Sequence, residues 1–170
     1  SRSPKVKLYL NDKLIGEKET GKENYTATFD VPYEPGTLKA VNSKGKEEFV
    51  LKTAGAPAAI RLIADRSKIK ACKNDLSYVK IELVDKNGNV VPETSLPVKI
   101  ECTGKGTVIA GGNAAYADME SFRSLTPNTF RGKAIAIVQP DGEKGDIQVK
   151  VSAKGLEDAS IVITLSLIHI

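Results

Sequence analysis

The strongest constraint on the fold of this 170-residue chain is the recurrence of an apolar residue at every second position. Two early runs show the alternation, one formed by Val6, Leu8 and Leu10 and the next by Tyr25, Ala27, Phe29 and Val31. Successive side chains of a β-strand point to opposite faces, so such runs predict strands with one buried face. Clusters of Gly, Pro, Asn and Asp separate the runs, as turns do between strands. The sequence therefore predicts an all-β protein.

Small residues interrupt the alternation at residues 53–58, where Gly and Pro stand among alanines. We interpret residues 55–58 as a linker between a small β domain over residues 1–54 and a larger one over residues 59–166, with residues 167–170 as a tail. A region of 54 residues is near the size at which a hydrophobic core is marginal. We therefore expect the first domain to be the C-terminal part of a truncated immunoglobulin-like β-sandwich.

The second region has the pattern of a complete immunoglobulin-like β-sandwich. Seven strands are predicted within it, over residues 59–65, 77–84, 97–102, 106–110, 133–138, 146–153 and 159–166. Seven short strands in about 110 residues are typical of this architecture. Asn87-Gly88 predicts a tight hairpin turn, after which Val90 and Val91 should face a partner sheet. The chain has no Trp, which favours a bacterial or fibronectin-like sandwich over an antibody domain.

Charge and hydropathy exclude several classes of partner. The net charge of +4 is spread evenly, because residues 1–54 carry ten Lys or Arg against eight Asp or Glu. Nucleic-acid binding usually needs clustered basic residues with interleaved aromatic ones, so no nucleic-acid partner is predicted. No apolar run approaches the roughly 18 residues of a membrane span, and the first residues lack the apolar stretch of a signal peptide.

The cysteines and the histidine provide no metal or catalytic centre by themselves. Cys72 and Cys102 lie 30 positions apart with no C-x-x-C spacing, and His169 is the only histidine. Zinc sites and Cys–His chemistry both lack ligands here. Two free thiols are favoured over a disulfide, which remains an alternative in an oxidising compartment. We expect no cofactor, no metal and no catalytic residue in this chain.

The candidate functional segment is the aperiodic stretch over residues 111–127, because long loops in compact domains are often functional. We take it as a contact loop with five candidate residues: Asn113, Tyr116, Asp118, Glu120 and Phe122. Glycosidic hydrolysis needs two carboxylates ~5–10 Å apart, and Asp118 and Glu120 would share one face if the segment were extended. Solvated surface acids are the favoured interpretation. A calcium loop is disfavoured because its D-x-[DN]-x-[DN]-G pattern is absent.

Aromatic residues make up only 5% of the chain, so a sugar-stacking platform has few possible members. Tyr9, Tyr33 and Tyr116 are the tyrosines expected to be exposed, and they are scattered along the sequence. A core or turn role is the safer interpretation of each. A glycan-binding role is therefore compatible with the sequence but is marked by no cluster.

Several strings resemble the C-terminal β domains of bacterial glycoside hydrolase family 2 proteins of the β-galactosidase type. They occur in the family's order, as L-N-D-K-L-I-G at residues 10–16, V-P-Y-E-P-G-T-L-K-A-V at 31–41, L-K-T-A-G-A-P at 51–57, L-I-A-D-R at 62–66, D-L-S-Y-V at 75–79 and V-D-K-N-G-N-V-V-P at 84–92. Two departures occur. Asp12 stands where the family has Gly, which implies a different turn, and residues 112–122 follow the family's G-N-G-x-P-x-x-x-E-x-F loop only loosely.

The resemblance implies a non-catalytic accessory region of a retaining, β-galactosidase-like enzyme. The family's two catalytic glutamates lie in an upstream (β/α) barrel, and no residue here matches either motif. The implied partners are that barrel and a neighbouring subunit, with glycans as a further candidate, and the implied location is the periplasm or the cell exterior. Two alternatives remain open, a carbohydrate-binding module and a cell-surface adhesin-type spacer, because sandwich folds serve all these roles.

Overall fold

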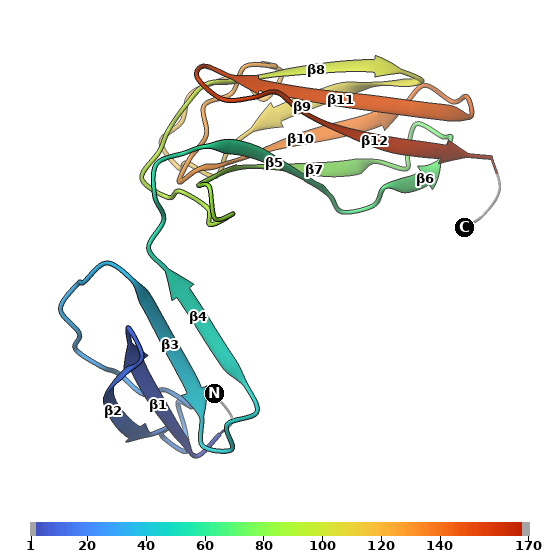
Figure 1. The fold of residues 1–170 in the computed structure, drawn as a ribbon. Helices are drawn as coiled ribbons and strands as arrows, with labels where there is room; N and C mark the ends of the chain where they lie inside the picture. The colour runs from blue at the N-terminus through green and yellow to red at the C-terminus, as the bar shows by residue number, and fades with distance from the viewer. Residues whose placement is uncertain (1–2, 168–170) are drawn as a thin grey trace. The chain divides into compact units, whose positions relative to one another are not determined.

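The computed structural model of this chain describes residues 3–167, and these residues form strands and turns without any helix. The prediction of an all-β protein is confirmed. The chain divides into two compact units, Ser1–Thr53 and Ala54–Ile170 (Figure 1). Among the described residues there is accordingly no helix that could cross a membrane. His169 and most of the predicted tail lie outside the described residues.

The first unit is a single antiparallel sheet of four strands in the order β2-β1-β3-β4 (Figure 1). Its strands are β1 (Lys5–Leu10), β2 (Lys13–Glu19), β3 (Thr37–Asn42) and β4 (Glu48–Lys52). The turn between β1 and β2 has positive φ angles at both central residues, 49° at Asn11 and 64° at Asp12. This is the type I′ geometry that matches strand twist, and Asn and Asp tolerate it better than most residues.

The strand predicted over residues 25–31 is wrong. These residues pair with no neighbouring strand, and Tyr25 has a φ of 50°, outside the β region. The alternation has another cause, because Ala27, Phe29 and Val31 are half-buried while Thr28 between them is exposed. The segment packs its side chains onto the sheet without joining the hydrogen-bonded ladder.

The second unit is an immunoglobulin-like sandwich of two four-stranded sheets, in the orders β5-β7-β10-β9 and β6-β12-β11-β8. Its strands are β5 (Ala59–Ala64), β6 (Lys68–Lys70), β7 (Ser77–Val84), β8 (Val98–Gly104), β9 (Gly106–Gly112), β10 (Lys133–Pro140), β11 (Gly145–Ala153) and β12 (Ala159–Ser166). Aliphatic side chains from both sheets fill the space between them, and Val79, Ile81, Ala136, Ile147 and Val149 are fully buried. Burial of this apolar surface drives the two sheets together.

All seven strands predicted for this sandwich are present, with shifts of one or two residues at several ends. The sequence pattern missed β6, which has three residues and pairs in parallel with β12. The predicted continuation of the hairpin is also incorrect. Val90 forms only an isolated bridge to Val84, and Val91 is buried without belonging to a strand.

The turn after β7 is organised by Asp85, whose side chain is 3% exposed. Its carboxylate accepts hydrogen bonds from the backbone N–H groups of Gly55, Asn87 and Asn89, and from the Asn89 side chain. These bonds, first among them that of Gly55, lower the pKa of Asp85 to about 2. The carboxylate therefore ties the predicted linker to the hairpin turn.

Both cysteines are free thiols in this structure. Cys72 is exposed, while Cys102 is half-buried with its Sγ 3.6 Å from the carbonyl oxygen of Gly106. Burial raises the pKa of the Cys102 thiol. The two side chains therefore differ in their access to solvent and to reagents.

Candidate functional site

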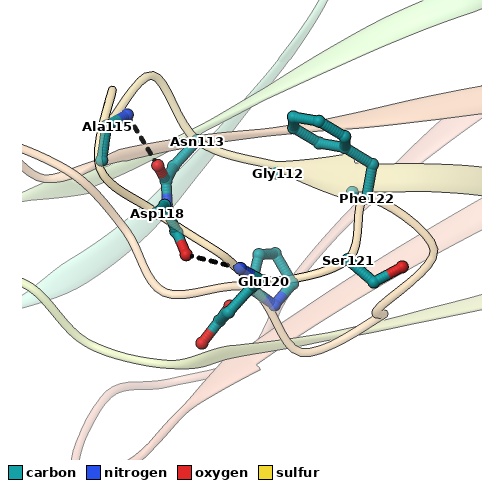
Figure 2. Close-up of a pocket in the computed structure, with 9 residues that line it drawn as sticks. Gly112, Asn113, Ala115, Asp118, Glu120, Ser121 and Phe122 are labelled. Atoms are coloured by element: carbon teal, nitrogen blue, oxygen red, sulfur yellow. Dashed lines mark hydrogen bonds between the residues drawn. The ribbon is translucent and has the colours of Figure 1, made fainter.

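The predicted contact loop leaves the sandwich at the end of β9 and returns before β10. Gly111 and Gly112 end the strand, and the N–H of Gly111 donates to the carbonyl oxygen of Phe122 at 2.7 Å. A Cβ at position 112 would lie 2.7 Å from the Phe122 ring, so only glycine leaves room for the ring there (Figure 2). The loop is thereby folded back against the strand from which it begins.

Asn113 connects the two arms of the loop. Its Nδ2 donates to Asp118 Oδ2 at 2.5 Å and to the Asn128 carbonyl oxygen at 2.9 Å. Its Oδ1 accepts the N–H of Ala115 at 2.7 Å (Figure 2). Asn and Asp side chains commonly organise turns in this way, because they replace backbone partners that an irregular segment lacks.

The two loop carboxylates continue the same network. Asp118 Oδ1 accepts the N–H of Glu120 at 2.9 Å (Figure 2). Glu120 reaches across the loop to Asn128, accepting its side-chain Nδ2 at 2.6 Å and its N–H at 3.3 Å. Turns at residues 116–117 and 122–123 flank the two acids, and both side chains are exposed.

A small open pocket is lined by four of the five candidate residues, Asn113, Asp118, Glu120 and Phe122, together with Gly111, Gly112, Ala115, Ser121 and Pro127. The sequence analysis had not singled out Ser121 or Pro127. Tyr116 does not line the pocket, and its side chain is 99% exposed. Tyr33 is also exposed, whereas Tyr9 is half-buried beneath the Lys39 ammonium.

The electrostatics of the loop favour the ionised form of Asp118. The hydrogen bond from the Glu120 N–H, reinforced by the Asn113 amide, lowers the pKa of Asp118. A general acid needs a raised pKa instead, so Asp118 is poorly suited to donate a proton. Within residues 3–167 there is also no group of three or more His, Cys, Asp or Glu side chains that could hold a metal ion. The network is suited to holding the loop in one shape.

The outer face of the β5-β7-β10-β9 sheet carries an apolar stripe beside this loop. Ile63, Tyr78 and Ile135 are 38–41% exposed there. In the strand register Tyr78 pairs with Ile137, and Ile135 pairs with Gly112, over which Phe122 lies. Lys80 lies between Ile63 and Ile135 and pairs with both. We call these five residues, Ile63, Tyr78, Phe122, Ile135 and Ile137, the outer stripe.

The tip of the loop carries two almost fully exposed side chains. Tyr116 is 99% exposed and Met119 is 95% exposed. Tyr and Met are enriched in protein interfaces, where they add large contact areas. A loop fixed by its own hydrogen bonds binds at a lower entropic cost than a mobile loop.

The architecture is that of an all-β chain whose larger unit is an immunoglobulin-like β-sandwich. Residues 60–162 match the family model described as glycoside hydrolase family 2 C-terminal domain 5. That match covers more than half of the chain, and the chain therefore belongs to glycoside hydrolase family 2. Residues 1–49 match a second family model, described as a domain of unknown function (DUF4982). The resemblance inferred from the sequence is confirmed.

Proteins similar to this chain are named as glycosidases or as members of glycoside hydrolase family 2. The beta-galactosidase BoGH2A of Bacteroides ovatus is 32% identical over 167 residues, which are 96% of this chain and 20% of that protein. A beta-glucuronidase of Formosa agariphila is 27% identical, over 96% of this chain and 17% of its own length. The crystal structure of a family 2 member from Bacteroides cellulosilyticus matches with a TM-score of 0.88 and 37% identity, covering 95% of this chain and 23% of that one. The chain thus spans about a fifth of the length of these relatives.

Proposed function

We propose that this chain is the non-catalytic C-terminal accessory region of a retaining, β-galactosidase-like enzyme that hydrolyses terminal β-galactosides or related glycosides. The observation that carries the proposal is the match of residues 60–162 to a C-terminal domain of glycoside hydrolase family 2. The relatives named beta-galactosidase and beta-glucuronidase are about five times longer than this chain. Their remaining length leaves room for a separate catalytic part.

In this proposal the accessory region packs on the catalytic part of the same polypeptide or on a neighbouring subunit. The contact surface consists of the outer stripe and the loop tip with Tyr116 and Met119. Several large side chains on one side of the sandwich are exposed in the isolated chain, and contact with a partner would remove them from water. Export to the periplasm or the cell exterior is part of the proposal and rests on the family resemblance alone.

The first test removes residues 55–170 from the full-length enzyme. We expect lower thermal stability, altered assembly or reduced hydrolysis of larger glycans, measured by calorimetry, light scattering and product analysis. Hydrolysis of a small chromogenic galactoside should be affected less than hydrolysis of larger glycans, because the catalytic residues lie elsewhere. If stability, assembly and activity are all unchanged, the accessory role is wrong.

A point variant locates the contact surface more sharply. Met119→Asp places a charge at the loop tip without altering the core, because the Met119 side chain is 95% exposed. In the full-length enzyme it should reproduce part of the effect of the deletion. Val162→Asp is the matched control, because Val162 is 49% exposed on β12 in the opposite sheet. Equal effects of both variants would argue against this contact surface.

A further inference from the structure

The sheet of the first unit has one charged face and one apolar face. On the charged face, Lys5 and Lys7 lie 3.5–3.7 Å from the Glu17 carboxylate, and the Lys39 ammonium lies over the Tyr9 ring. Side chains of directly paired residues point to the same side of a sheet. The register therefore groups seven apolar residues on the opposite face, with Asn42 and Lys18 beside Val6 at one end: Val6, Leu8, Leu10, Leu38, Ala40, Phe49 and Leu51. We call them the inner face.

The inner face is only partly covered by the unit itself. At the β2 side, the Phe29 ring lies about 3.5 Å from the position that a Cβ on Gly16 would occupy, and Gly16 pairs with Leu8. Leu8 is accordingly 9% exposed and is the only buried apolar residue of the described part of this unit. At the β4 side, Phe49 is 67% exposed and Leu51 is 55% exposed. The covering by the segment around Phe29 thus does not extend to β4.

A sheet with this pattern is half of a sandwich. Two packed sheets bury alternating residues from their inner faces and leave the other faces to solvent. A charged face backed by seven apolar residues has that pattern, and it lacks the opposing layer within residues 3–53. A single sheet that exposes its largest apolar side chains buries little apolar surface, and an opposing layer would bury more of it.

From this amphipathic sheet we infer that the inner face is covered by a second β-sheet contributed by the same polypeptide outside residues 1–170. The inference rests on the proposed function, in which the chain is one part of a longer enzyme. The occupant is a sheet whose apolar residues alternate, because the face to be filled is itself a strand face with Phe49 and Leu51 in line along β4. The strands of β1–β4 and that sheet then form one domain.

The test measures thiol labelling at β4 in the full-length enzyme and in the 170-residue chain. Phe49→Cys and Leu51→Cys each place a thiol on the inner face, and Val50→Cys places one on the charged face of the same strand. Cys72→Ser removes the exposed native thiol from all three variants. The peptide that contains the new thiol is quantified by mass spectrometry after timed exposure to a small alkylating reagent. Circular dichroism and thermal unfolding confirm that each variant is folded.

We expect labelling at positions 49 and 51 to be slower in the full-length enzyme by at least about tenfold, because burial lowers the fraction of thiolate and blocks access of the reagent to it. Labelling at position 50 should change by less than about threefold. Equal labelling of the inner face in both proteins overturns the inference. Protection in the 170-residue chain that increases with protein concentration also overturns it, because a second copy would then be the occupant.

The two proposals fail separately in this design. A full-length protein without glycosidase activity would refute the proposed function, and labelling would still show whether its remaining residues cover the inner face. Full activity with unprotected thiols at positions 49 and 51 would refute the second sheet alone.

Discussion

Replacing Asn113 with alanine is expected to loosen the contact loop without unfolding the sandwich. The side chain makes three hydrogen bonds, donating to Asp118 and to the Asn128 carbonyl oxygen and accepting from Ala115. All three partners belong to the loop or to its return to the sandwich, and none lies in the core between the sheets. The variant therefore removes the connection between the arms of the loop and leaves the aliphatic core intact.

The size of the effect follows from the number of bonds. A hydrogen bond contributes about 0.5–1.5 kcal/mol net, and water compensates partly for lost bonds at a half-buried site. We expect the free energy of local opening to fall by about 1–3 kcal/mol, which speeds amide exchange in the loop roughly 5- to 150-fold. The global free energy of unfolding should change by less than about 1 kcal/mol, because the global transition reports the core.

Hydrogen–deuterium exchange followed by mass spectrometry measures this effect in peptides from residues 113–124. Ser121→Ala is the matched control, since that hydroxyl accepts one long hydrogen bond, from the Arg123 N–H at 3.2 Å. Its exchange should rise by less than about threefold. If Asn113→Ala leaves loop exchange within a factor of about two of the unsubstituted chain, the network does not hold the loop, and our account of its shape is wrong.

Three further predictions concern the sandwich and are measurable on the 170-residue chain. Leu83→Ala should lower the free energy of unfolding by about 2–5 kcal/mol in urea titrations, because the Leu83 side chain is fully buried; a smaller loss would mean that the core closes around the cavity. Hydrogen bonds, first that of the Gly55 N–H, lower the pKa of Asp85 from 3.8 to about 2. The ionised carboxylate therefore stabilises the fold above pH 4, and this contribution is lost as the pH falls toward 2. Asp85→Asn should therefore flatten the stability curve over that interval, and an unchanged slope would contradict this role. Cys72 should react with a thiol reagent at pH 8 much faster than Cys102, whose pKa burial raises, and equal rates would contradict the half-buried position of Cys102.

The sandwich could be predicted from the sequence because its strands obey a local rule. In β11, buried and exposed residues alternate from Ile147 to Val151, so a pattern of period two locates the strand without any tertiary information. The rule does not predict β6. Its three residues are too few to show a period, and they form a strand only because β12 lies alongside.

The same alternation misleads where a segment packs without pairing. Phe29 and its neighbours alternate because every second side chain contacts the sheet, yet their backbone joins no ladder. Whether a backbone finds a partner depends on distant residues, and a single-strand pattern contains no information about them.

The sequence predicted where the candidate loop lies but not its conformation. Its lack of periodicity identified the segment, and its polar residues were identified as candidates. The bonds from Asn128 to Glu120 and from Asn113 to Asp118 were not predictable, because they depend on how the chain returns to β10. The two acids are exposed, as a solvated pair would be, and they are also hydrogen-bonded constituents of the loop.

The parallel pairing of β6 with β12 has a mechanical consequence. Lys68–Lys70 follow the entry of the chain into the sandwich, and their partners Thr164, Leu165 and Ser166 lie at its exit. When two parallel strands are pulled from these opposite ends, the force acts along the strands. The hydrogen bonds between the strands are then sheared and break together. Antiparallel strands pulled from adjacent ends would instead lose their hydrogen bonds one after another. A pull on the two ends of the sandwich therefore loads this three-residue pairing in shear.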